Sequence, residues 1–283
     1  IPAIIYIGLN FGNEVTSNGW AIPTATDIAF ALGVVTLLGN RVPISLKVTL
    51  VAVAIIDDLM AIIIIASFYT SDLSITYLVF AALSTATLLI LNNRKITKLS
   101  PYVLVGILLW VFVLKSGIHA SLAGVVLAQF IPINAKNSSD HSPLYKLEHS
   151  IEPWVNFMIL PIFAFANAGV SFSGMKLNLL WDPVTLGIIL GLFFGKQIGV
   201  MLFTYIGSLL RICKLPSDVS WAQYYGLSIV TGIGFTMSLF IGSLAFTDPE
   251  YQTSVRLGVL IASLFAGVLG YLTLRLTTKP PSQ

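Results

Sequence analysis

Long apolar stretches, separated by short polar connections, set the pattern of this 283-residue chain. About ten such stretches are visible, near residues 1–12, 21–39, 44–68, 74–92, 101–114, 117–131, 154–172, 184–210, 221–246 and 255–276. Several reach the roughly 20 residues that a helix needs to cross the hydrocarbon core of a bilayer. Because a backbone in hydrocarbon must satisfy its own hydrogen bonds, the pattern predicts an all-α, polytopic membrane helix bundle.

The composition agrees with a membrane protein and excludes several other classes. Hydrophobic residues make up 56% of the chain and charged residues only 10%, against about 25% charged residues in a soluble domain. The net charge of +3 is too small to indicate nucleic-acid binding, and the single Cys213 excludes a disulfide framework or a cysteine-based metal cluster. No soluble domain or low-complexity tract is visible, so we expect one transmembrane domain over residues 1–283.

The distribution of Lys and Arg predicts how the chain crosses the membrane. If successive connections alternate between the two sides, eleven basic residues fall on one side and three on the other. The richer side is expected to be cytoplasmic, and it includes the C-terminus. The eleven are Arg41, Lys47, Arg94, Lys95, Lys98, Lys136, Lys146, Arg211, Lys214, Arg275 and Lys279, and the three are Lys115, Lys176 and Arg256. The first apolar stretch is too short to cross a bilayer, so we expect it to be the end of a helix whose start is missing.

One basic residue, Lys196, lies deep inside an apolar stretch, in LGLFFGKQIGV. A lysine at the centre of a transmembrane helix costs about 2.5–3.5 kcal/mol on insertion scales. We therefore expect Lys196 to have an acidic partner.

Three of the twelve acidic residues, Asp27, Asp57 and Asp58, also lie inside apolar stretches. Asp57 and Asp58 are adjacent in LVAVAIIDDLMAIIIIA, and intramembrane acids are typical of ion paths and proton relays. A purely structural role, as partners of Lys196, is the alternative. Neighbours on a helix point about 100° apart, so one lysine can hardly neutralise both. The second carboxylate would then hold either a proton or a hard cation such as Na⁺, which is the competition that an antiporter needs.

Asp27 lies in a stretch, WAIPTATDIAFALG, where Pro23 and polar residues interrupt the apolar pattern. One interpretation is a proline-kinked helix with a capping Asp27. The other is an unwound crossing in which Asp27 offsets the positive ends of two half-helices. A second interruption, SIVTGIGFTMSLF, contains Gly232 and Gly234. Interrupted helices at corresponding places in inverted halves indicate a transporter ion site.

Together these segments resemble the NhaA family of bacterial Na⁺/H⁺ antiporters, a family that itself exemplifies inverted repeats. The likeness runs through GWAIPTATDIAFALG, LVAVAIIDDLMAIIII, LKSGIHASLAG, LPIFAFANAGVSF, LFFGKQIGV and GIGFTMSLFI, and so spans essentially the whole chain. The resemblance implies two inverted three-helix repeats with crossed discontinuous helices. It also implies electrogenic, pH-regulated exchange of Na⁺ or Li⁺ for more than one H⁺ across the bacterial inner membrane. By the same resemblance, we expect the family's first two helices and part of the third to be missing from this sequence, and homodimer contacts to come from that region.

The resemblance also implies roles for single residues. Asp58 corresponds to the principal Na⁺ ligand, and Asp57 to the neighbour that alternates between a proton and the lysine at Lys196. Asp27 and Thr26 fall in the helix crossing, as do Gly232 and Gly234, and Asp27 is expected to compensate charge there. No resident cofactor is implied.

Three further residues are linked to pH response. His119, in SGIHASLAG, matches a histidine of the family that is tied to pH response, although a lone histidine near a helix end is often only a packed or interfacial residue. Glu148 and Glu152 fall in the family's pH-sensing region, and Glu152 stands where some relatives have a second histidine.

Rival functions have weaker support. A Na⁺-coupled symporter with a related crossed-helix fold would need polar or basic groups around a larger cavity, and beyond Lys196 the apolar stretches offer none. A channel would need a filter-like segment. An enzyme would need a nucleophilic, metal-binding or phosphate-binding constellation, and the sequence contains none.

Overall fold

In the computed structural model, residues 1–69, 73–133, 142–169 and 177–278 are described, and within them helices are the only regular secondary structure. This confirms the prediction of an all-α protein. The chain divides into two compact units. Unit 1 comprises Ile1–Ala61 and Phe163–Gln283, and unit 2 comprises Ile62–Ile162.

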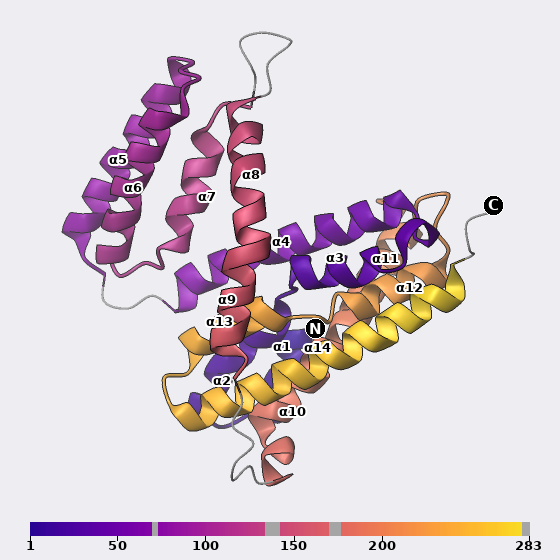
Figure 1. The fold of residues 1–283 in the computed structure, drawn as a ribbon. Helices are drawn as coiled ribbons and strands as arrows, with labels where there is room; N and C mark the ends of the chain where they lie inside the picture. The colour runs from indigo at the N-terminus through magenta and orange to yellow at the C-terminus, as the bar shows by residue number, and fades with distance from the viewer. Residues whose placement is uncertain (70–72, 134–141, 170–176, 279–283) are drawn as a thin grey trace. The chain divides into compact units, whose positions relative to one another are not determined.

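Unit 1 takes its helices from both ends of the chain (Figure 1). The N-terminal part contributes α1 (Pro2–Leu9), α2 (Glu14–Ser17), the 3₁₀-helix η1 (Asn18–Thr24), α3 (Ile28–Thr36), the short η2 (Gly39–Arg41) and most of α4 (Ile44–Phe68). The C-terminal part contributes most of α9 (Leu160–Asn167), η4 (Leu177–Trp181), α10 (Pro183–Leu190), η5 (Gly191–Gly195), α11 (Lys196–Leu209), α12 (Trp221–Val230), α13 (Phe235–Ala245) and α14 (Pro249–Thr277).

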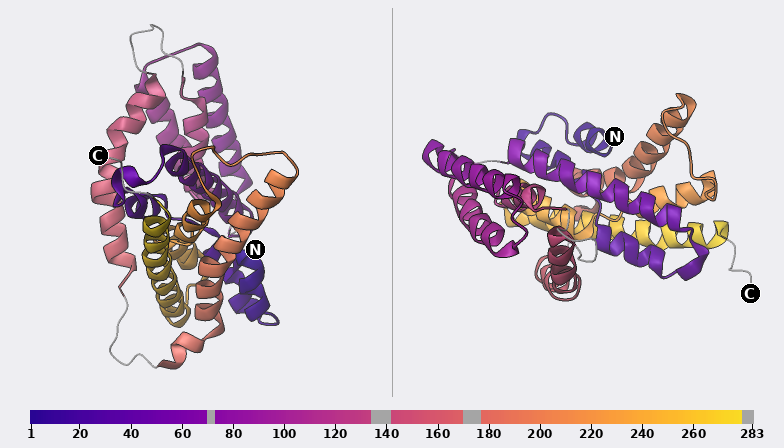
Figure 2. Two further views of the ribbon diagram at one scale, coloured as in Figure 1. Left: turned by 90° about the vertical axis from the view of Figure 1, so that its right-hand side faces the viewer. Right: turned by 90° about the horizontal axis from the view of Figure 1, so that it is seen from above.

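The core of unit 1 forms around α14, which packs along α12 and α10 (Figures 1 and 2). Leu46 and Leu50 of α4 are fully buried, in one cluster with Leu227 of α12 and Leu274 of α14. Gly270 of α14 lies so close to α12 that a Cβ there would be 3.2 Å from the backbone nitrogen of Val230. Small residues at such contacts let membrane helices approach closely, which compensates for the weak hydrophobic driving force between helices in lipid.

Two helices of unit 1 are interrupted, as the sequence predicts. Residues Glu14–Thr24 and Ile28–Thr36 meet at 41°, and Trp221–Val230 and Phe235–Ala245 meet at 43°. The first break follows Pro23, which cannot donate a backbone hydrogen bond. The second contains two glycines, which weaken a helix interior. Each break leaves backbone groups available for other partners.

Unit 2 is an apolar helical bundle. Its helices α5 (Ile75–Asn93), α6 (Leu99–Lys115) and α7 (Ser121–Phe130) lie side by side (Figures 1 and 2). The helix α8 (Pro143–Trp154) follows and continues into the π-helix η3 (Val155–Ile159). The fully buried side chains of Leu88 and Tyr102 lie in the core cluster of this unit.

Several boundaries differ from those expected. The helix α8 occupies part of what the sequence suggested was a polar connection, because Ser142 caps it and Pro143 begins it. Leu144 and Leu147 then give the helix an apolar face that packs on the unit 2 cluster. The helix α7 begins at Ser121, so His119 precedes it, and α14 begins at Pro249, where Asp248 accepts a hydrogen bond from the backbone of Glu250.

Four helices of the described residues are long and apolar enough to cross a membrane, or six if each bent pair counts as one span. Leu99–Lys115 and Ser121–Phe130 are shorter apolar helices. The protein is therefore a multi-pass membrane protein. The division into about ten spans stays a prediction.

Candidate ion-binding site

The two adjacent aspartates lie in the middle of α4, and both side chains are half-buried. They have different surroundings. Asp57 Oδ2 accepts hydrogen bonds from Lys196 Nζ at 2.5 Å and from the hydroxyl of Thr26 at 2.7 Å. The structure thus brings together three residues from α4, α11 and the first break.

Lys196 is the first residue of α11, and only 5% of it is exposed. Its ammonium is paired with Asp57, whose side chain keeps 26% of its surface accessible. Removing two charges from water is expensive, and a buried ammonium is tolerated only with a close, hydrogen-bonded counter-ion. The pair is closed on the lysine side and open on the aspartate side, so another cation can approach Asp57 from there.

Asp58 lacks such a partner. Its Oδ1 atom is buried and has no hydrogen bond from any residue that the structure describes. A buried carboxylate oxygen without a donor costs free energy. Either a proton on the carboxylate or a hard cation beside it would remove that cost, and oxygen is the ligand atom that hard cations prefer. The two remedies exclude each other, so this oxygen suits a site where Na⁺ and H⁺ compete.

The two breaks cross next to Asp57. The backbone nitrogen of Asp27 donates to the carbonyl of Ile233 at 2.7 Å, and this hydrogen bond joins the two interrupted segments directly. The hydroxyl of Thr26 lies 2.9 Å from the carbonyl of Thr231, and that of Ser238 donates to Ile22 at 2.8 Å. Backbone groups that a continuous helix would use internally form hydrogen bonds here with the other interrupted segment.

Asp27 stabilises this crossing with its side chain. It caps α3 by accepting from the backbone nitrogen of Phe30 at 3.1 Å. It also accepts from the backbone nitrogen of Thr236, at 2.9 Å, and from the Thr236 hydroxyl, both at the start of α13. Only 2% of Asp27 is exposed. Helix N-termini carry partial positive charge, so one carboxylate interacts favourably with two of them. Both interpretations of Asp27, cap and crossing residue, therefore describe real contacts.

The glycines of the second break provide room. A Cβ on Gly232 would lie 2.8 Å from the carbonyl oxygen of Leu192, and one on Gly234 would lie 2.7 Å from the Leu192 side chain. Leu192 belongs to η5, the π-helical turn just before Lys196. The break and the lysine-bearing helix thus approach closely because these positions have no side chain.

Sequence reasoning did not assign the roles of Thr231 and Thr236. Both were visible only as polar residues that weaken an apolar stretch. Thr236 follows the break by two residues, where a helix presents unpaired backbone N–H groups. That position is a signal that it would donate to a carboxylate.

The three residues that sequence analysis linked to pH response lie in unit 2. His119 is half-buried in the connection between α6 and α7, and its Nδ1 atom accepts from the backbone nitrogen of Ser121 at 3.4 Å. Burial lowers the pKa of His119 below its ordinary value of 6.5. Glu148 and Glu152 are exposed on α8.

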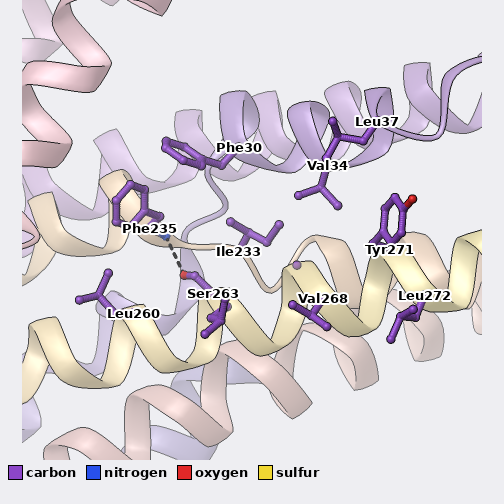
Figure 3. Close-up of a pocket in the computed structure, with 12 residues that line it drawn as sticks. Phe30, Val34, Leu37, Ile233, Phe235, Leu260, Ser263, Val268, Tyr271 and Leu272 are labelled. Atoms are coloured by element: carbon purple, nitrogen blue, oxygen red, sulfur yellow. Dashed lines mark hydrogen bonds between the residues drawn. The ribbon is translucent and has the colours of Figure 1, made fainter.

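A groove with a cavity of about 490 Å³ lies between α3, the second break and α14 (Figure 3). Its described walls are mostly apolar, with hydroxyls on Ser263 and Tyr271. The Ser263 hydroxyl accepts from the backbone nitrogen of Phe235 at 3.2 Å, the contact dashed in Figure 3. Phe30 and Phe235 close part of it with an edge-to-face contact at 4.6 Å. The described residues that line this groove include no carboxylate.

Crossed, interrupted helices beside buried acidic and basic side chains define a secondary ion transporter. The family profile described as Na⁺/H⁺ antiporter 1 matches residues 1–274. The chain belongs to this family of Na⁺/H⁺ antiporters, the NhaA family, whose members are transporters and not enzymes.

Individual relatives agree. A protein of Caulobacter vibrioides named Na⁺/H⁺ antiporter NhaA is 54% identical over 99% of this chain and 68% of its own length. Na⁺/H⁺ antiporter NhaA 2 of Shewanella denitrificans is 55% identical over 95% of this chain and 68% of its own length. A Na⁺/H⁺ antiporter NhaA of Pelagibacter ubique is 54% identical over 99% of this chain and 72% of its own length.

Proposed function

We propose that the protein extrudes Na⁺ or Li⁺ in exchange for more than one H⁺ per cycle, and that it does so electrogenically and under pH control. The observation that carries this proposal is the contrast between Asp57, which is paired with Lys196, and Asp58, which has a buried oxygen without a hydrogen-bond partner among the described residues. Protons and cations compete for these two carboxylates.

The carboxylates of Asp58 and Asp57 and the hydroxyl oxygen of Thr26 are the groups that would hold the cation. All three offer oxygen, and hard cations bind oxygen in preference to nitrogen or sulfur. We propose that these oxygens line a small cavity, which a dehydrated Na⁺ or Li⁺ fits better than the larger K⁺.

Lys196 accounts for the state without Na⁺. Its ammonium neutralises Asp57 at 2.5 Å, and cation entry has to weaken that pair because both compete for one carboxylate. Asp27 accepts hydrogen bonds at two helix starts, which supports a role in which it compensates their partial charges and helps the cation, without being the main carrier.

The number of carboxylates sets the charge balance. Two of them, Asp57 and Asp58, become available where one Na⁺ binds, so more than one proton leaves for each cation taken up. Net charge then crosses the membrane in every cycle. Exchange also stops at acid pH, because a protonated aspartate does not bind Na⁺.

Family membership supports the remaining proposals. The protein resides in the bacterial inner membrane with its C-terminus in the cytoplasm, in line with the excess of Lys and Arg on that side. A homodimer is proposed on the same ground, and His119, Glu148 and Glu152 are proposed to tune the pH response.

Proteoliposomes test the central proposal. The protein is reconstituted, a pH gradient is set, and NaCl, LiCl or KCl is added while the internal pH is followed. Na⁺ and Li⁺ should collapse the gradient and K⁺ should not. Uptake of an organic solute with Na⁺, without proton movement, would instead establish a symporter.

A further inference from the structure

The direction of Lys196 depends on the π-helical turn η5 that precedes it. Residues Pro183–Leu209 run as one long helix, and η5 (Gly191–Gly195) interrupts its α-helical hydrogen bonding. A π-helical turn accommodates an extra residue. One extra residue rotates everything after it by about 100°. The turn therefore decides which way Lys196 points relative to α10.

The same turn contacts the second break. Leu192 is fully buried, with its carbonyl oxygen against Gly232 and its side chain against Gly234. A Cβ at either glycine would lie within 2.8 Å of Leu192, which is closer than real contacts allow. The turn η5 thus packs against the second break at Gly232 and Gly234, where a larger residue would not fit.

These contacts continue through the ion site and return to the lysine-bearing helix. Gly232 follows Thr231, whose carbonyl lies 2.9 Å from the Thr26 hydroxyl. That hydroxyl lies 2.7 Å from Asp57, and Asp57 is bonded to Lys196. Leu192 lies inside the π-helical turn, and Lys196 follows that turn directly as the first residue of α11.

We infer that Leu192, Gly232 and Gly234 are positioning residues for Lys196. The carbonyl of Leu192 lies against Gly232 and its side chain against Gly234, and these contacts fix the π-helical turn so that the ammonium faces Asp57. The inference rests on the proposed function and extends it, because a shift of the second break moves η5 and with it Lys196. These residues act through the lysine and determine how strongly it competes with Na⁺ for Asp57.

The first test compares two buried side chains on the same long helix. Leu192→Ala removes the side-chain contact with Gly234 and keeps the carbonyl that lies against Gly232, whereas Ile188→Ala removes a fully buried side chain that faces α14. Both variants should lower Tm. Only Leu192→Ala should lower the Na⁺ KM, by roughly threefold, near the lower end of the range expected for sites coupled through a backbone shift, because the ammonium competes less well. Leu192→Met, which keeps the volume, should restore the parental KM.

The second test compares two glycines that both lie against a carbonyl of this helix. Gly232→Ala would press on Leu192, and Gly258→Ala would press on the carbonyl of Thr185 from 3.0 Å away. We expect the first substitution to change the Na⁺ KM and the second to leave it at the parental value. An equal change in both would overturn the inference.

A thermodynamic cycle does not require transport. If Leu192 acts through the lysine, Leu192→Ala should lower Tm less in a Lys196→Ala background than in the parent, whereas Ile188→Ala should cost the same in both. Additive losses for Leu192→Ala, or an unchanged or raised KM, would refute its positioning role. Failure of the unmodified protein to exchange Na⁺ for H⁺ would instead refute the proposed function, and the stability cycle would still decide the positioning role.

Discussion

The two units are built from similar apolar helices, yet they differ in what they bury. Unit 1 buries Asp27 and Lys196, the charged side chains that are buried among the residues the structure describes. The buried polar side chains described in unit 2 are Ser84 and Ser116, whose hydroxyls donate to carbonyls of their own helices. Unit 2 thus needs no special partners, whereas unit 1 needs a counter-charge or a donor for each buried charge.

The interrupted helices explain why unit 1 can hold charge. A continuous helix uses its backbone N–H groups internally, so it has none left for a carboxylate. The breaks free the backbone nitrogens of Phe30 and Thr236, and both donate to Asp27. Unit 2 contains the π-helix η3, but its described residues contain no comparable pair of interrupted helices that cross each other. Broken helices and buried charge therefore depend on each other.

The largest expected effect on transport comes from changing Asp58, the carboxylate of unit 1 whose buried oxygen lacks a hydrogen-bond partner among the described residues. Asp58→Asn in unit 1 should abolish Na⁺-driven proton movement, because an amide of the same shape can carry neither a proton nor a charge for the cation. Folding should persist, since no described residue donates to the buried oxygen of Asp58. The measurement is Na⁺-induced collapse of a pH gradient in proteoliposomes, with gel filtration as the control for folding. Normal exchange in this variant would remove Asp58 from the ion site.

The second effect compares a buried charge in unit 1 with a buried hydroxyl in unit 2. Lys196→Ala leaves Asp57 without its counter-ion, and removal of one partner of a buried pair costs about 3–5 kcal/mol. Ser84→Ala removes only a bond within one helix, and a neutral hydrogen bond contributes about 0.5–1.5 kcal/mol. Thermal unfolding in detergent should therefore show a much larger fall in Tm for Lys196→Ala, and its transport should have a shifted pH profile. Equal falls would contradict the pairing.

The third effect concerns net charge. If more than one proton enters for each Na⁺ that leaves, an interior-negative potential should accelerate Na⁺ efflux even without a pH gradient. A full elementary charge gains about 2.3 kcal/mol per 100 mV. Proteoliposomes with a K⁺ diffusion potential and valinomycin measure this directly. Rates that do not respond to voltage would mean one proton per Na⁺, and Asp57 would then be only the structural partner of Lys196.

The sequence predicted the helical fold and both interruptions, because a broken apolar pattern is visible in the chain. It also predicted an acidic partner for Lys196, because a charge inside an apolar stretch is rare, and the family resemblance implied which residues lie at the crossing. It did not predict the contacts of Leu192 and Thr236, which depend on which segments approach in three dimensions. The π-helical turn η5 before Lys196 has no sequence signature beyond Gly191 and Gly195. The role of Thr236 depends on which segment lies opposite it in the fold. The helix α8 was missed because its apolar face is narrow and its other residues are polar. Assignments of ion binding and pH response to particular residues stay predictions.

The smallest expected effect lies in unit 2, at His119. Burial lowers the pKa of this imidazole, so the folded protein favours the neutral form. The unfolded chain then binds the proton more readily, and the stability that the neutral ring contributes is present above its ordinary pKa of 6.5 and lost as pH falls through the lower folded value. His119→Asn keeps an acceptor but cannot titrate. Between pH 8 and pH 5.5, the Tm of the parent should fall slightly more than that of the variant, while the Na⁺ KM at alkaline pH stays unchanged. Identical slopes would show that His119 contributes nothing to the pH dependence of stability, and a changed KM would place it in the ion site.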